Sequence, residues 1–293
     1  MKNFFLILVF ANFWLCTIGQ TKPNIEWVDI PAGTFTMGSP ETEVDRNKDE
    51  TQHKVTLSAF KMSKYEITVA QFKAFVDATG YVSDAEKGVG GSDGSAIWSD
   101  NKFDFKAGVN WRCDVKGKPR PDSEYNHPVI HVSWNDAVAF ANWMGCRLPT
   151  EAEWEYACRA GTTTPFNTGK KLTTAQSNFD GKMPYNKNPS GINREMTVPV
   201  GSFAPNEWGL YDMHGNVWEF CADYCDWDQI NKVVVTDTYI NEINNPLCKT
   251  GSNRIHRGGG WSYFADACRS AWRYSSNPAF RSYSLGFRLV SPK

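Results

Sequence analysis

Three segments of the chain combine a capping residue with an apolar stripe and therefore predict helices. The first follows Thr68, which can form a capping box with Gln71, and it ends at Gly80. The same pattern predicts a second helix within 133–145 and a third within 150–161. All three are short, so helices account for only a small part of the fold.

Short apolar or alternating runs elsewhere predict strands, and long loops rich in Gly, Asn, Asp and Pro join them. Few helices and many short strands do not suit a doubly wound parallel sheet. The fold class predicted is α+β, with little regular secondary structure and one domain. The predicted strands are Glu26–Ile30, His53–Leu57, Phe60–Tyr65, Ile130–Val132, Arg254–Arg257 and Gly286–Val290.

The first residues carry the pattern of an export signal. Lys2 precedes an apolar run that ends near Leu15, and small residues follow up to Gly19. The run is shorter than the roughly 20 apolar residues of a membrane span, and no second run follows. We expect a signal peptide at 1–19, a single domain at 20–293, and an exported (periplasmic or secreted) protein without a membrane span. Lipidation of Cys16 is the alternative, which the bulky residues before it disfavour.

Charge and cysteine content narrow the function classes. With 31 Lys and Arg against 32 Asp and Glu, the net charge is −1, which excludes a strongly basic nucleic-acid binder. Seven of the eight cysteines follow the signal segment, and an odd number leaves at least one unpaired in an oxidising compartment. No pair of CxxC knuckles is present, so a structural zinc site is not expected.

A series of short motifs allows the chain to be compared with a known family. In chain order they are FTMG (35–38), KYEIT (64–68), HPV (127–129), VSW (132–134), RLPTEAEWEY (147–156), GLYDM (209–213), GNVWE (215–219), RGG (257–259) and GFR (286–288). In this order they resemble the formylglycine-generating enzyme, or sulfatase-modifying factor, family over about residues 27–291. The resemblance implies a variant of the C-type-lectin-like fold that calcium stabilises. It also implies an enzyme that oxidises a sulfatase cysteine to formylglycine with oxygen and a copper(I) ion held by two cysteines.

The resemblance also assigns calcium ligands. A hard cation needs several carboxylate, amide or carbonyl oxygens, which a tight loop can present. The family's first calcium site implies ligands at Asp212, Gly215, Val217 and Glu219. A second site implies Asn178 and Phe179, although its usual downstream Asp has no clear match. The alternative for the first site is a capped turn with a solvated acid.

The copper position is where the sequence departs from the family. Counted from Arg257, the two copper cysteines fall on Tyr263 and Cys268, so one thiolate is missing. Copper(I) is soft and favours two thiolates, so copper is not expected here and no catalytic residue is assigned. The resemblance places Cys268 instead in a structural disulfide with Cys158. The positions of a second family disulfide are Ala141 and Leu289, so that bridge is absent.

The segment 262–284 places aromatic residues among Ser and Ala, as adaptable binding surfaces do. In hypervariable display relatives this segment carries the diversity. It predicts a ligand surface of Tyr263, Phe264, Tyr274, Phe280 and Tyr283, with a place in the core as the alternative.

The sequence therefore favours a calcium-stabilised, non-catalytic or divergent paralogue that binds a protein or peptide ligand, with a sulfatase as one candidate. The alternatives are an active oxidase with altered ligands and a hypervariable ligand-display protein.

Overall fold

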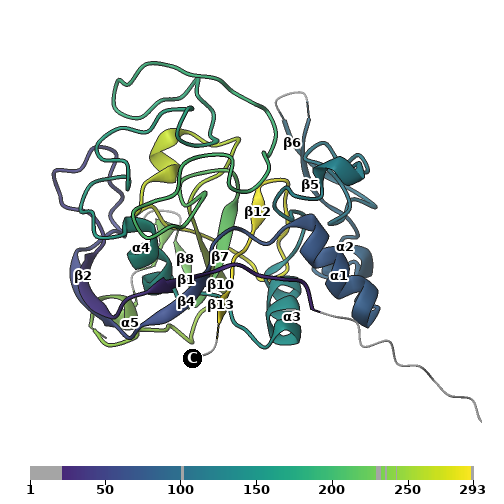
Figure 1. The fold of residues 1–293 in the computed structure, drawn as a ribbon, viewed down its shortest axis with the longest axis horizontal. Helices are drawn as coiled ribbons and strands as arrows, with labels where there is room; N and C mark the ends of the chain where they lie inside the picture. The colour runs from purple at the N-terminus through teal and green to yellow at the C-terminus, as the bar shows by residue number, and fades with distance from the viewer. Residues whose placement is uncertain (1–21, 100–101, 229–231, 235, 242, 292–293) are drawn as a thin grey trace, which may run out of the picture.

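Two sheets lie at the centre of the molecule (Figure 1), as a computed structural model describes it for residues 22–99, 102–228, 232–234, 236–241 and 243–291. The larger sheet has the order β11-β10-β7-β12, and the smaller has the order β1-β4-β13. Three two-stranded sheets, β2–β3, β5–β6 and β8–β9, are attached around them. Helices α1, α2 and α3 lie on one side of the sheets in Figure 1, and α4 and α5 lie on the other.

The described helices are α1 (Val69–Thr79), α2 (Asp84–Lys87), α3 (Trp134–Met144), α4 (Glu151–Arg159) and α5 (Asp237–Ile240), with 3-10 turns at Asp122–Glu124 and Ala265–Cys268. The described strands are β1 (Trp27–Ile30), β2 (Gly33–Met37), β3 (His53–Leu57), β4 (Phe60–Ser63), β5 (Ser95–Ser99), β6 (Lys102–Lys106), β7 (Trp218–Cys225), β8 (Trp227–Asp228), β9 (Lys232–Val233), β10 (Asn253–Arg257), β11 (Tyr274–Ser276), β12 (Leu285–Gly286) and β13 (Val290–Ser291).

The three predicted helices are confirmed, because their caps form as expected. In α1 the Gln71 backbone N–H donates to the Thr68 hydroxyl, and the Gln71 side chain accepts from the Thr68 N–H. Helices α3 and α4 carry the same reciprocal bonds. Helix α4 ends one residue earlier than expected, because Ala160 is the capping residue and takes the left-handed conformation, with φ 45°.

The strand predictions are confirmed in part. The predicted strand Ile130–Val132 is wrong: His131 has φ 60°, a left-handed conformation that no strand accommodates. The predicted strand Gly286–Val290 is divided between β12 and β13. The sequence analysis missed the central strand β7, because the polar residues Glu219 and Asp223 interrupt its apolar pattern although both are buried.

Buried Arg–Glu pairs connect the loops where regular structure is sparse. Of the almost fully buried arginines in the C-terminal part of the described chain, four contact a buried glutamate. Their partners lie in the N-terminal loops, in α4 and in β7, so the pairs join segments far apart in sequence. The pairs are Arg257–Glu155, Arg269–Glu50, Arg273–Glu151 and Arg288–Glu219.

In the described ranges no helix is both long and apolar enough to cross a membrane. The predicted signal peptide at 1–19 lies outside the described residues.

Candidate functional site

Three carboxylates meet in the interior beside a single guanidinium. Glu66 accepts from the Asn216 side chain at 2.7 Å, and Arg288 donates to both oxygens of Glu219 at 2.6 and 2.7 Å. Burial, with Asp212 and Glu219 nearby, raises the pKa of Glu66 well above its usual value. Burial also raises the pKa of Asp212 to about 6. The excess of negative charge favours a bound cation.

One buried oxygen in each of the two predicted calcium sites has no hydrogen-bond donor among the described residues. The Oδ2 atom of Asp212 accepts from the Gly201 N–H at 2.7 Å, whereas its Oδ1 atom has no partner. The side-chain nitrogen of Asn178 donates to the Met196 carbonyl at 2.9 Å, and its Oδ1 atom has no partner. Buried acceptors without a donor are rare, and each belongs to a predicted calcium ligand. The oxygen-rich chemistry therefore fits calcium.

The loop from Asp212 to Glu219 is tightly folded against Asn178. Asp212 and Asn216 have left-handed φ values of 59° and 67°. A Cβ atom added at Gly215, where φ is 105°, would lie 2.4 Å from the Asn178 carbonyl oxygen, so glycine is needed at this position. Asn216 joins the two predicted calcium sites, because its N–H donates to the Asn178 carbonyl at 2.8 Å.

Glu219, a predicted calcium ligand, is also held by donors of the protein. Its carboxylate already accepts from Arg288 and from the Trp154 indole N–H, at 2.7 Å. Glu66 lies next to the same loop, where it accepts hydrogen bonds from the Asn216 side chain and, at 3.2 Å, from the Val217 N–H. The sequence analysis missed Glu66, although it lies within the KYEIT motif. In the described part of the chain no group of three His, Cys, Asp or Glu side chains is arranged to hold a metal by itself, so amide and carbonyl oxygens must complete any calcium site.

An aromatic centre, defined as Trp218, His256, Tyr263 and Tyr274, occupies the expected copper position. The Tyr263 ring meets the edge of Trp218 with centroids 5.2 Å apart, and Trp218 also contacts His256 at 5.1 Å and Tyr274 at 5.8 Å. Burial raises the pKa of Tyr263, so its phenol stays protonated. A neutral phenol is a poor ligand for a soft ion.

Cys268 does not provide the second thiolate. It is fully buried in a cluster with Phe166, Phe179 and Ala265, and burial raises the pKa of its thiol. Copper(I) therefore does not fit the residues at these two positions.

The predicted disulfide between Cys158 and Cys268 is not formed in this structure, in which all seven described cysteines are free thiols. Both residues adjoin one imidazole: His214 lies 3.7 Å from the Cys158 sulfur and 2.7 Å from the Cys268 carbonyl. The Nδ1 atom of His214 faces the Cys268 carbonyl, and its Nε2 atom accepts from the Asn167 N–H at 2.9 Å. Burial lowers the pKa of His214 to about 4. The imidazole is therefore neutral, and the bridge stays a prediction for the oxidised protein.

The predicted ligand surface is brought together only in part. Tyr263, Phe264 and Tyr274 are half-buried around Trp218 and Trp272. Phe280, also half-buried, lines a separate cavity beside β6. Tyr283 is only 4% exposed, so the alternative of a core aromatic holds for this residue.

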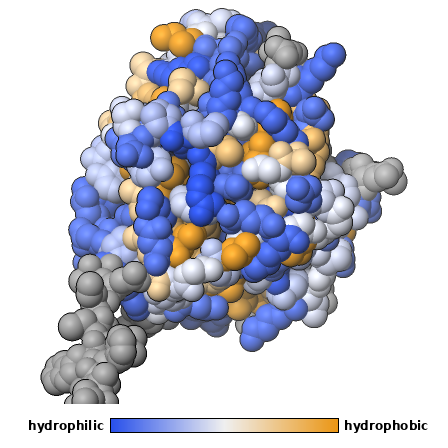
Figure 2. Space-filling model, turned by 90° about the vertical axis from the view of Figure 1, so that its right-hand side faces the viewer, coloured by the Kyte–Doolittle hydropathy of each residue, from blue (hydrophilic) through white to orange (hydrophobic). Residues whose placement is uncertain are grey.

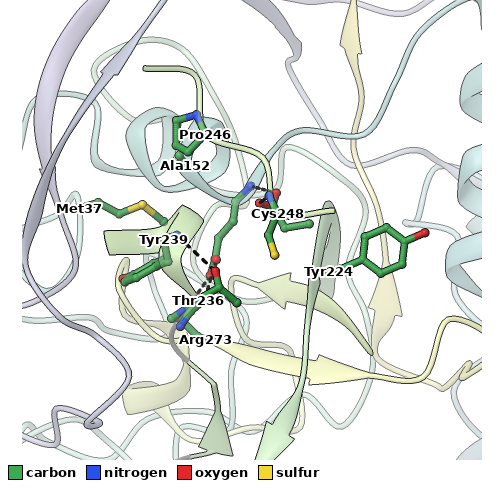
Figure 3. A pocket seen from close by; sticks show the side chains of 10 residues that line it. Met37, Ala152, Tyr224, Thr236, Tyr239, Pro246, Cys248 and Arg273 are labelled. Carbon is green, nitrogen blue, oxygen red and sulfur yellow. Dashed lines mark hydrogen bonds and ion pairs between the residues drawn. The ribbon is translucent and has the colours of Figure 1, made fainter. Parts of the chain in front are cut away.

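A small buried cavity lies between α4, β7 and α5 (Figure 3). Arg273 points into it and binds both oxygens of Glu151 at 2.7 and 2.8 Å, and Asp223 accepts from the Cys248 N–H at 2.9 Å. Its volume of about 10 Å³ holds one water molecule at most. We assign it a structural role.

Comparisons with known proteins agree with this arrangement. The family described as "Sulfatase-modifying factor enzyme 1-like domain" matches residues 17–293. The "Formylglycine-generating enzyme" of Bos taurus is 36% identical, over 93% of this chain and 76% of its own length. The protein of the same name from Streptomyces coelicolor is also 36% identical, over 90% of this chain and 88% of its own.

Solved structures support the same fold. PvdO from Pseudomonas aeruginosa superposes with a TM-score of 0.68 at 29% identity, covering 92% of this chain and 95% of its own. Treponema denticola variable protein 1 shares the fold at 22% identity, with a TM-score of 0.59 and coverage of 91% and 95%. The predicted fold class, α+β of the formylglycine-generating-enzyme type, is confirmed. The chain belongs to the sulfatase-modifying factor enzyme 1-like family.

Proposed function

We propose that this protein is an exported, calcium-stabilised binding member of its family, which does not carry out copper-dependent cysteine oxidation. The observation that carries the proposal is Tyr263, whose ring packs against Trp218 at the place of the first copper cysteine. Oxidation by oxygen at copper(I) needs a pair of thiolates to hold the ion, and this chain offers a half-buried tyrosine and a buried neutral thiol at those positions.

The aromatic centre supports a binding role. Ring contacts connect it to the surface, since Trp227, 39% exposed, lies 5.2 Å from Tyr274. Tyr274 in turn contacts Trp218 at 5.8 Å. Aromatic side chains held by one another present a large contact area at little entropic cost. A protein or peptide is therefore the proposed ligand, with a sulfatase as one candidate.

Calcium would hold this scaffold together. The oxygens without donors are proposed ligands of the two predicted sites: Asp212, beside the Glu66 carboxylate, for the first, and Asn178 for the second. Ions there would fix the 212–219 loop, which is bonded to Asn178, and that loop leads directly into β7, which carries Trp218. The calcium role is thus to fix the strand that supports the aromatic centre.

Two measurements on the purified protein test the proposal. A copper(I) titration in competition with a colorimetric chelator should show no tight binding. Incubation with oxygen, copper(I) and a cysteine-containing sulfatase peptide should yield no aldehyde by hydrazide labelling, with a serine-containing peptide as the blank. Tyr263→Cys should not restore aldehyde formation, because Cys268 remains buried and protonated. Aldehyde formed by the unmodified protein would contradict the proposal.

An active oxidase with altered ligands is the second candidate, and a specific observation favours it: 36% identity to a formylglycine-generating enzyme over 93% of the chain. The same aldehyde assay separates the two. If aldehyde appears without Tyr263→Cys, the oxidase reading replaces the binding protein. A hypervariable display protein has weaker support, since the likeness to Treponema denticola variable protein 1 concerns the fold alone.

A further inference from the structure

Strand β6 is the outer strand of a hairpin on the surface. All five of its residues are exposed, and among the described strands it pairs with β5 alone. Phe103 and Phe105 are 56% and 41% exposed, which is unusual for two aromatic residues of one strand. An exposed edge with apolar side chains is a template for pairing with another chain.

The register shows which backbone groups lie at this open edge. Ala96 and Trp98 donate their N–H groups away from β6, to the carbonyls of Arg281 at 3.3 Å and Val115 at 3.2 Å. The ladder bonds to β6 therefore come from the alternate β5 residues, which oppose Lys102, Asp104 and Lys106. It follows that the backbone groups of Phe103 and Phe105 point to the free edge.

Part of this edge is already protected. The Phe105 N–H is bonded to the Asp104 carboxylate at 2.8 Å. The Phe103 N–H and the carbonyls of both phenylalanines remain, and within the described ranges no strand pairs with them. A single added strand has donors and acceptors to bind.

The two faces of β6 differ in chemistry. Phe103 and Phe105 share one face, because side chains alternate along a strand. The ring centroids of Phe103 and Tyr283 are 6.5 Å apart. Phe105 and Phe280 both line a cavity of about 180 Å³. Lys102 and Lys106 share the opposite face with Asp104, and the net charge of that face is positive.

Arg281 adds positive charge beside Phe105. It is 3% exposed, and its guanidinium donates to the backbone carbonyls of Val89, Ser92, Gly94 and Ala279. No carboxylate of the described residues lies within ion-pair distance of it, but Asp84, Asp136 and Asp93 are near enough to act on its charge. The exposed Lys102 and Lys106, rather than the enclosed Arg281, therefore favour a partner with negative charge.

We propose that β6 binds an extended peptide segment of a partner protein, in which acidic and apolar side chains alternate. The segment adds to the hairpin as a further strand through the backbone of Phe103 and Phe105. Its apolar side chains pack on the two phenylalanines, and its acidic side chains face Lys102 and Lys106. Figure 2 shows the side of the molecule that carries the hairpin: its apolar side chains form small separate patches among polar ones, as suits a strand rather than a flat apolar partner.

A second copy of this chain is a poorer occupant. Antiparallel pairing of β6 with its copy about Asp104 would place the two Asp104 side chains opposite each other, and Lys102 opposite Lys106. Like charges directly opposite one another destabilise a strand pair. Charge therefore selects an acidic partner over self-association.

The test uses a fluorescein-labelled hexapeptide of alternating glutamate and valine, with the full-length protein and fluorescence anisotropy. A peptide of the same composition, with three glutamates followed by three valines, is the control. We expect the alternating peptide to bind and the control to bind about tenfold more weakly or not at all. Equal binding of the two peptides would overturn the proposal.

Variants locate the binding. Phe103→Pro removes the outward N–H without touching a ladder bond to β5, as edge strands tolerate. It should weaken binding about five- to tenfold, whereas Phe103→Val, which keeps the donor, should weaken it less. The double variant Lys102→Glu and Lys106→Glu should abolish binding of the acidic peptide, and it serves alone if Phe103→Pro does not fold.

Three further outcomes contradict the proposal: unchanged binding by Phe103→Pro, unchanged binding by the charge-reversed variant, or a dimer in light scattering that Phe103→Pro converts to a monomer. The last would assign the edge to a second copy. The inference does not depend on the function proposed above, because the copper and aldehyde assays do not measure binding at β6.

Discussion

Asp212→Asn is the change that most directly tests the calcium site. The Asp212 Oδ2 atom accepts from the Gly201 N–H at 2.7 Å, and its Oδ1 atom has no partner. An asparagine oxygen would take the Gly201 bond and turn its NH₂ group toward the ion. Asparagine tolerates the left-handed φ of 59° at this position, so the backbone should not change. Glu219→Gln is a poorer choice, because it also breaks the pair with Arg288.

The magnitude follows from charge and mass action. When all three carboxylates are ionised around the one guanidinium, they leave an excess of two negative charges, which one calcium ion neutralises. Extracellular calcium modules have Kd values of roughly 10⁻⁴–10⁻³ M. At about 10 mM calcium the ion then stabilises the folded state by about 1.4–2.7 kcal/mol. At roughly 2 °C per kcal/mol for a domain of this size, the expected rise in Tm is about 3–5 °C.

Differential scanning calorimetry after dialysis against chelator, with and without added calcium, measures this rise. The unmodified protein should show it, and Asp212→Asn should lose most of it. Asp29→Asn removes a carboxylate whose side chain is 83% exposed, and it should respond to calcium as the unmodified protein does. A melting curve that calcium leaves unchanged, or an equal response from Asp212→Asn, would refute the reasoning.

Three further results are expected. Calcium affinity, measured by isothermal titration calorimetry, should fall about tenfold between pH 7 and pH 5. Burial raises the pKa of Asp212 to about 6, so at the lower pH the ion must displace a proton. An affinity that does not change with pH would contradict this assignment. Arg257→Met, which removes a fully buried guanidinium, should lower the free energy of unfolding in urea by about 3–5 kcal/mol. Lys73→Met, at an exposed ion pair, should lower it by under about 1 kcal/mol. Similar losses in the two variants would contradict the view that the buried pairs hold the loops together. Protein isolated without reductant should yield a Cys158–Cys268 peptide in non-reducing maps, and reductant should then lower its free energy of unfolding by about 4–5 kcal/mol; a free Cys158 in that map would show the pairing to be wrong.

Local signals were sufficient for the helices. The capping boxes at Thr68, Ser133 and Thr150 involve residues three positions apart, so the sequence alone determines where those helices begin. The calcium site in the loop at 212–219 was expected from the family resemblance and stays a prediction, and among the described residues Asp212 has an oxygen without a donor there.

Tertiary structure decided the rest, because the groups involved meet across long separations in sequence. Glu66 lies beside Asp212 and Glu219 in the folded protein, where Asn216, 150 residues later in the sequence, donates to it. Strand β7 could not be predicted from its pattern, since Arg288, 69 residues away, pairs with Glu219 and makes a charged position compatible with a buried strand. The open edge of β6 was likewise beyond the sequence, because it depends on which residues of β5 turn their N–H groups toward Val115 and Arg281. Such pairings arise from the packing of loops around the sheets, and no local pattern of hydrophobic and polar residues encodes them.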